Sequence, residues 1–202
     1  MLLALAPLIA TATSASASAA PPTVLVMGDS LSAGYGMAAE QGWVALTAKR
    51  IAVEKPRWRV VNASISGETT AGGRSRIIDA LARERPQVVV IALGANDGLR
   101  GLPTARSAAN LAYMIGAAHG IGAKVLLIGM QMPPNLGAGY TRAFEQNYRT
   151  LAQRFDVSLL PFLLAPIATD RDAYQDDNLH PTAAVQPQLR DHVWTMLAPL
   201  LD

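Results

Sequence analysis

The chain has 202 residues, 50% of them hydrophobic, which is enough to bury one sizeable core without requiring a second domain. Its formal net charge is only +2, its 17 basic residues are scattered along the chain, and it contains no cysteine. These features exclude a disulfide framework and thiolate metal ligation, and they give no support to a nucleic-acid partner.

The first twenty residues have the composition of an export signal. Leu2 to Ile9 form an apolar stretch, small residues fill Thr11 to Ala20, and Ala17-Ser18-Ala19 fits a small-x-small cleavage site. No basic residue precedes the apolar stretch, which departs from the usual signal peptide, and a disordered Ala/Ser tail is the alternative. We expect residues 1–20 to be a signal peptide and residues 21–202 to form a single domain. The mature protein is then expected to be periplasmic or secreted, monomeric and without a stable membrane anchor.

Five short apolar runs predict buried strands. Val24 to Met27 ends at Gly28, and Gln87 to Leu93 is the strongest strand signal because it is β-branched, uncharged and short. The other three expected strands cover residues 59–62, 124–130 and 157–160.

Helical spacing of apolar residues separates these strands. The expected helices run from Trp43 to before Pro56, from Gly72-Gly73 to before Pro86, from Thr104 to about His119, from Tyr140 to Arg154, and from about Thr182 to Leu200. Strands that alternate with helices imply right-handed crossovers and a mainly parallel sheet covered on both faces. We therefore predict a three-layer α/β/α fold with a flavodoxin-like, doubly wound five-stranded sheet of order 2-1-3-4-5.

The predicted strand order brings Ser30, Gly67 and Asn96 together, because these residues follow the first three strands. A serine hydroxyl is protonated at neutral pH and needs a base in order to act as a nucleophile. Backbone N–H groups of Ser30 and Gly67 and the side-chain amide of Asn96 could stabilise an oxyanion. Taken singly, Gly67 and Asn96 are more typical of ordinary turns.

His180 is the strongest candidate for the base among three histidines. It precedes Pro181, and Asp177 lies three residues before it, so one short turn can bring a carboxylate to Nδ1 and leave Nε2 free to face Ser30. Asp176 is the alternative carboxylate. The other two histidines, His119 at the end of a helix and His192 inside the last helix, are interpreted as structural or surface residues.

Four blocks carry these residues in order: residues 28–32 (GDSLS), 62–69 (NASISGET), 94–97 (GAND) and 177–181 (DNLHP). Together they resemble the SGNH (GDSL) hydrolases, most closely the bacterial thioesterase I/lysophospholipase L1/arylesterase branch. The resemblance implies that Ser30 is the nucleophile, that Asp177 and His180 complete a triad, and that Ser30, Gly67 and Asn96 form the oxyanion hole. One departure is Ala95, where this branch often has a second glycine, and it could shift Asn96 slightly.

The implied function is that of an exported serine esterase acting on acyl or aryl esters, and on thioesters or lysophospholipids, through an acyl-enzyme. No metal or organic cofactor is expected, and the partner is a small-molecule acyl ester or thioester. Apolar side chains on loops near Ser30 suggest a groove for an acyl chain. The candidates are Leu99, Leu102, Met132, Pro133, Leu136 and Tyr140. By resemblance the loop over residues 131–140 is a movable rim, with a rigid surface loop as the alternative.

Two other functions compete with this interpretation. A carbohydrate O-acetylesterase of the same superfamily would need an open polar cleft, and the aromatic content of 5% gives little material for stacking on sugars. A non-catalytic exported binding protein could keep the fold, but the intact Ser, His and Asp argue against it.

Overall fold

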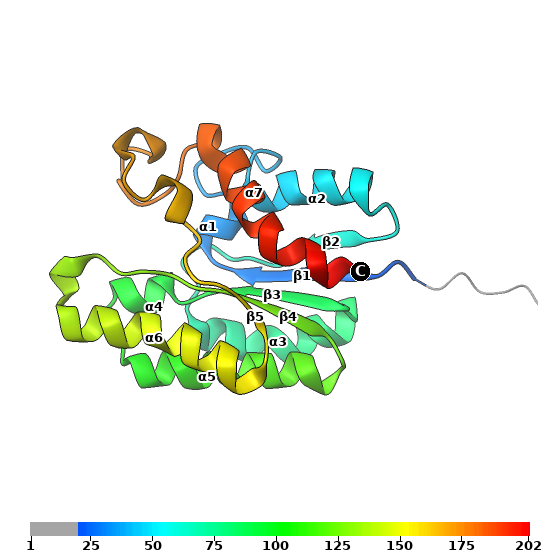
Figure 1. Cartoon of the computed structure of the whole chain (residues 1–202), viewed down its shortest axis with the longest axis horizontal. Coiled ribbons are helices and arrows are strands. Elements are labelled where there is room, and N and C mark those ends of the chain that lie inside the picture. Colours follow the sequence, from blue (N-terminus) through cyan, green and yellow to red (C-terminus); the bar gives the residue numbers. More distant parts are fainter. Residues whose placement is uncertain (1–19) are drawn as a thin grey trace, which may run out of the picture.

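The computed structural model describes residues 20–202, and the five expected strands form one parallel sheet of order β2-β1-β3-β4-β5 (Figure 1). The strands are β1 (Thr23–Gly28), β2 (Arg59–Asn62), β3 (Val88–Ala92), β4 (Lys124–Ile128) and β5 (Ser158–Leu160). The predicted doubly wound α/β fold and its strand order are confirmed. Apart from Ala20, the expected signal peptide lies outside the described residues.

The two central strands, β1 and β3, are apolar along almost their whole length because both of their faces are covered. Every residue of β1 and β3 is buried, as a parallel sheet covered on both faces requires. The two strands pair in parallel register, with Leu25 beside Val89 and Gly28 beside Ala92. The strands at the two ends of the strand order, β2 and β5, are shorter and only partly buried, because each has a neighbouring strand on one side only.

Helices cover the two faces of the sheet. In Figure 1, α2 (Trp43–Glu54) and α7 (Gln186–Leu197) pack together above it. Below it lie α3 (Thr70–Glu84), α5 (Thr104–Gly120) and α6 (Ala138–Phe155). α6 buries Phe144, Tyr148 and Leu151, whose spacing of four and three residues places them on one side of a helix.

The structure differs from the sequence expectation at the helix ends. Two short helices, α1 (Ser30–Ala33) and α4 (Ala95–Leu99), follow β1 and β3 where the sequence predicts turns. The expected last helix is divided into the 3₁₀ turn η4 (Ala183–Val185), α7 and the 3₁₀ turn η5 (Ala198–Leu201). A proline lies in the first turn of both α7 and η5, and because proline lacks an N–H it interrupts the hydrogen-bond series there.

The carboxyl ends of all five strands meet at one edge of the sheet, on the left in Figure 1. The segment between β5 and α7, coloured orange-brown, lies above this edge and contains the short turns η2 (Ala165–Ile167) and η3 (Arg171–Ala173). Within residues 20–202, no helix combines the length and the apolar character that crossing a membrane would require.

Asp29 links β1 to α1 with a buried carboxylate. Its Oδ1 accepts a hydrogen bond from the backbone N–H of Leu31 at 3.0 Å and so caps the first turn of α1, the helix that begins at Ser30. The residue is 2% exposed, and this burial raises the pKa of its carboxyl from 3.8 to about 6.

The raised pKa of Asp29 predicts a pH-dependent gain in stability on replacement by Asn. The folded protein holds this proton more tightly than the unfolded chain does. Above pH 6 the carboxyl is ionised in both states, and its buried charge destabilises the fold; below pH 4 it is protonated in both states, and this penalty is absent. Asn keeps an oxygen for the Leu31 N–H. In urea unfolding, Asp29→Asn should be about 1–3 kcal/mol more stable than the wild type at pH 8, with the gain vanishing near pH 4. A difference that is the same at both pH values would contradict this explanation.

Gly129, directly after β4, allows a close backbone approach. Its N–H donates to the Leu160 carbonyl at 2.8 Å, and a Cβ at this position would lie 2.3 Å from the Pro161 carbonyl oxygen. Gly129→Ala should therefore lower the free energy of unfolding by about 1–3 kcal/mol. Gly116→Ala is the matched control, because Gly116 is an exposed residue of α5 and nothing lies within 4 Å of the new Cβ. It should gain about 0.5–1 kcal/mol, and equal losses in the two variants would refute the steric argument.

Candidate active site

Ser30, His180 and Asp177 lie in one hydrogen-bonded chain at the carboxyl edge of the sheet. His180 Nε2 lies 2.8 Å from Ser30 Oγ, and His180 Nδ1 lies 2.6 Å from Asp177 Oδ2. A ring that donates from Nδ1 to the carboxylate has Nε2 free to accept the serine proton. This is the arrangement that a general base for Ser30 requires.

A tight turn fixes the carboxylate beside the ring. Asp177 Oδ1 accepts the backbone N–H groups of Leu179 and His180, both at 2.9 Å, while Asn178 adopts a left-handed conformation with φ 55°. The hydrogen bond from the His180 N–H, followed by that from its ring, lowers the pKa of the Asp177 carboxyl to about 2. The carboxylate is therefore ionised at neutral pH and can accept a hydrogen bond from His180 Nδ1.

The position of the imidazole is set by further contacts. Gln175 donates from its backbone N–H to the His180 carbonyl at 2.8 Å and from Nε2 to the Tyr35 carbonyl at 2.9 Å. The ring of Tyr35 lies against that of His180, with centroids 4.6 Å apart. These contacts tie the loop of His180 to the segment that follows α1.

The competing candidates lie elsewhere. Asp177, and not Asp176, supplies the carboxylate that contacts His180. His192 Nε2 contacts the Phe162 carbonyl at 3.0 Å, and His119 packs edge-on against Phe155. Neither histidine is among the residues that line the cavity at Ser30.

Ser30, Gly67 and Asn96 line one small cavity of about 140 Å³, together with His180. Gly67 has φ +79°, a conformation that favours glycine, and nothing lies within 4 Å of the place where a Cβ would stand. Asn96 Nδ2 donates to the Glu68 carbonyl at 3.0 Å. An amide nitrogen carries two hydrogens, so one is left that can be directed at a substrate oxygen.

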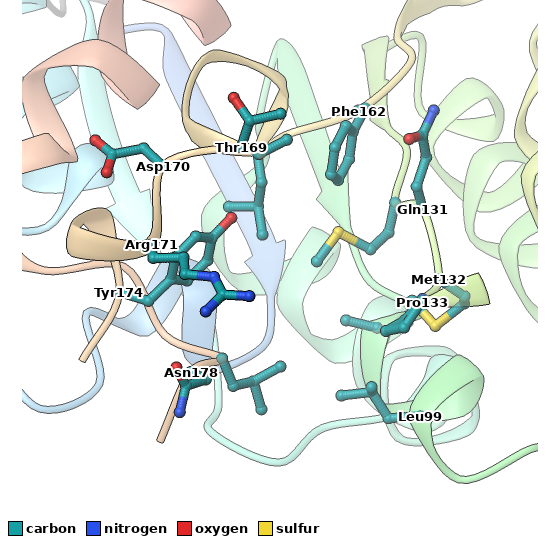
Figure 2. Close-up of a pocket in the computed structure, with 15 residues that line it drawn as sticks. Leu99, Gln131, Met132, Pro133, Phe162, Thr169, Asp170, Arg171, Tyr174 and Asn178 are labelled. Atoms are coloured by element: carbon teal, nitrogen blue, oxygen red, sulfur yellow. The ribbon is translucent and has the colours of Figure 1, made fainter. Parts of the chain in front are cut away.

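A larger cavity of about 500 Å³ adjoins the first, and the two share Ala95, Leu99, Met130 and Leu179 in their linings. Figure 2 shows two walls. One is formed by Leu99 and the segment after β4, including Met132 and Pro133, and the other by the segment that carries Thr169, Arg171 and Tyr174. The first wall is mostly apolar and the second is mixed, so the cavity can accept a chain of methylene groups beside Ser30.

The residues expected to line a groove divide into two groups. Leu99, Met132 and Pro133 line the larger cavity. Leu102, Leu136 and Tyr140 are absent from both linings: the Tyr140 hydroxyl donates to the Leu102 carbonyl at 2.8 Å, and Leu136 packs against the core.

The sequence alone does not identify several residues that line the two cavities. Phe162, Leu164, Arg171 and Tyr174 belong to a segment without helical or strand periodicity, so no pattern placed them near Ser30. Leu179 could have been found, because it stands beside His180 in the DNLHP block.

No three His, Asp or Glu side chains in residues 20–202 are grouped so that they could hold a metal ion.

Comparisons with known proteins give the family of this chain. Residues 26–186 match the family described as GDSL-like lipase/acylhydrolase. The chain is 50% identical over 183 residues to esterase TesA of Pseudomonas aeruginosa, with 91% of each chain covered. It is 38% identical over 188 residues to thioesterase 1/protease 1/lysophospholipase L1 of Escherichia coli, covering 91% of this chain and 87% of that protein.

The fold is also shared with solved structures. A crystal structure of TesA superimposes with a TM-score of 0.85 at 49% identity, covering 88% of this chain and 99% of that one. The psychrotrophic esterase EstA from a Pseudoalteromonas species, in a structure inhibited by monoethylphosphonate, superimposes with a TM-score of 0.84 at 36% identity. The match covers 89% of this chain and 98% of that one. The resemblance drawn from the four sequence blocks is thus confirmed. This chain belongs to the GDSL-like lipase/acylhydrolase family, the SGNH hydrolases, and is an enzyme that hydrolyses ester bonds.

Proposed function

We propose that the enzyme cleaves acyl esters and thioesters through a Ser30 acyl-enzyme, with His180 as general base and acid and Asp177 as its orienting carboxylate. The observation that carries this proposal is the unbroken series of contacts at 2.6 Å and 2.8 Å from Asp177 through His180 to Ser30. Relatives named esterase TesA, arylesterase and thioesterase 1/lysophospholipase L1 support the same class of substrate.

In the first step, Ser30 Oγ attacks the acyl carbonyl carbon while its proton moves to His180 Nε2. The carbonyl oxygen becomes an oxyanion, which receives hydrogen bonds from the N–H groups of Ser30 and Gly67 and from Asn96 Nδ2. The tetrahedral intermediate then expels the alcohol or thiol, which takes the proton from His180. Water repeats the sequence on the acyl-enzyme, releases the carboxylic acid and restores the Ser30 hydroxyl.

The larger cavity is proposed to hold the acyl chain. Its shared lining with the Ser30 cavity allows a carbonyl in the smaller space to continue into the larger one. Leu99, Met132 and Pro133 would contact the chain, whereas Leu102, Leu136 and Tyr140 would act only by supporting the loops. Burial of methylene groups there favours longer acyl chains, by up to about 0.8 kcal/mol for each group.

We also propose export. The apolar stretch and the small-residue motif at residues 17–19 support removal of residues 1–20, leaving a single domain that works in the periplasm or outside the cell.

The orienting role of Asp177 can be tested against its neighbour. Asp177→Asn removes the negative charge that faces His180 Nδ1 and allows the wrong tautomer, so kcat for p-nitrophenyl butyrate should fall by about 10²- to 10⁴-fold. Asp176→Asn makes the same chemical change one residue away and should leave kcat within about twofold of the wild-type value. Equal losses in the two variants would contradict the assignment of Asp177.

The acyl-chain cavity can be tested by filling it. Ala168 lines the larger cavity and is exposed to it, so Ala168→Phe should lower kcat/KM for p-nitrophenyl decanoate by about tenfold, as expected for the loss of two buried methylene contacts. The rate with the butyrate ester should change by less than about threefold, because a short chain stays near Ser30. Ala165→Phe is the control, since Ala165 is exposed on the same segment but is not part of the lining. A parallel fall with both esters would exclude this cavity as the acyl site.

A further inference from the structure

A buried carboxylate lies directly behind the proposed oxyanion hole. Asp97 follows Asn96 in α4 and is only 2% exposed. Its Oδ2 accepts the backbone N–H of Thr70 at 2.8 Å, and its Oδ1 accepts the hydroxyls of Thr70 at 2.5 Å and Ser107 at 3.0 Å. Within the described chain no Lys, Arg or His forms an ion pair with it.

Thr70 links Asp97 to the loop that carries Gly67, on the other side of the proposed oxyanion hole. It is the first residue of α3, and the loop that leads into α3 carries Gly67 and Glu68. Asn96 Nδ2 donates to the Glu68 carbonyl at 3.0 Å, and Arg100 Nη2 donates to the Gly67 carbonyl at 3.1 Å. Residues 96–100 and residues 67–70 are therefore joined at three points, of which the bonds between Asp97 and Thr70 are buried.

Burying a carboxylate without a cation is unfavourable for folding, so stability alone does not explain this group. What a carboxylate adds is short, charge-assisted hydrogen bonds that hold their donors more firmly than a neutral acceptor does. Donors for an oxyanion need such firm placement, because they act only when they lie at hydrogen-bond distance from the developing charge.

We infer that Asp97 is a positioning residue for ester hydrolysis: it fixes the Asn96 amide and the Gly67 N–H relative to Ser30 by clamping the start of α3 to α4. The inference rests on the proposed oxyanion hole. Asp97 is not among the residues that line the Ser30 cavity, so it acts through Asn96 and the Gly67 loop and not on the substrate.

The variant Asp97→Asn tests the clamp. An Asn oxygen can still accept the two hydroxyls, but its NH₂ group then faces the Thr70 N–H, and that bond is lost. We expect kcat for p-nitrophenyl butyrate to fall by about 10- to 100-fold with KM changed by less than about threefold, since the oxyanion contact forms in the transition state. Thr70→Val replaces the hydroxyl with a methyl group and keeps the backbone N–H, so kcat should fall by a smaller factor. This variant replaces Asp97→Asn as the test if Asp97→Asn does not fold.

A control separates positioning from general loosening of the fold. Gln87 Oε1 accepts the backbone N–H of Thr23 at 2.7 Å at the opposite end of the sheet. Gln87→Met removes that acceptor and should lower the thermal midpoint without lowering kcat. If Gln87→Met and Asp97→Asn lose kcat equally at matched stability, Asp97 has no positioning role.

A double-mutant cycle gives the decisive readout. If Asp97 acts through Asn96, then Asp97→Asn should reduce kcat at least fivefold less in an Asn96→Ala background than in the wild type. The full loss in both backgrounds would overturn the inference, because it would mean that the two residues act independently. The proposed function has a separate test: if the Ser30→Ala variant still hydrolyses the ester, the Ser30 mechanism is wrong, whatever the result for Asp97.

Discussion

Parallel pairing of β1 with β2 on one side and β3 on the other is the constraint on which the site depends. The pairing places Val26 beside both Asn62, where β2 ends, and Val90, and β1 and β3 end side by side at Gly28 and Ala92. The chain segments that leave them carry Ser30, Gly67 and Asn96, and these residues meet in one cavity although they are far apart in sequence. A change that shifted the register of either pairing would move a proposed oxyanion donor away from Ser30.

The proposed base lies on a different kind of structure. His180 lies on an irregular segment above the sheet edge, and local hydrogen bonds hold it: the Asp177 carboxylate accepts two backbone N–H groups and contacts the ring, and Gln175 bridges to Tyr35. The proposed nucleophile and oxyanion donors thus directly follow strands of the sheet, while the imidazole and its carboxylate belong to one short turn that lies against them. The clamp between Asp97 and Thr70 adds a second, buried connection on the sheet side.

Sequence patterns predict the sheet well because its central strands β1 and β3 are buried on both faces and read as uninterrupted apolar runs. They predicted the positions of Ser30, Gly67, Asn96, Asp177 and His180 because each follows a strand or occupies a short motif. They did not predict α1 and α4, since four or five residues are too few to show a helical period. The second wall of the larger cavity was also missed, because residues 162–174 fold through turns and tertiary contacts that leave no periodic signal. Tyr140, expected near the substrate, instead directs its hydroxyl to the Leu102 carbonyl.

The central claim is that one hydroxyl, activated by His180, forms the covalent intermediate. Covalent labelling tests it most directly: the enzyme is treated with an ethyl fluorophosphonate, and the adduct is located by peptide mass spectrometry while residual esterase activity is followed. The proposed mechanism predicts one phosphonyl group per chain, on Ser30, formed in proportion to the loss of activity. Complete inactivation with Ser30 unmodified, or with the adduct on a neighbouring residue such as Ser66, would contradict it.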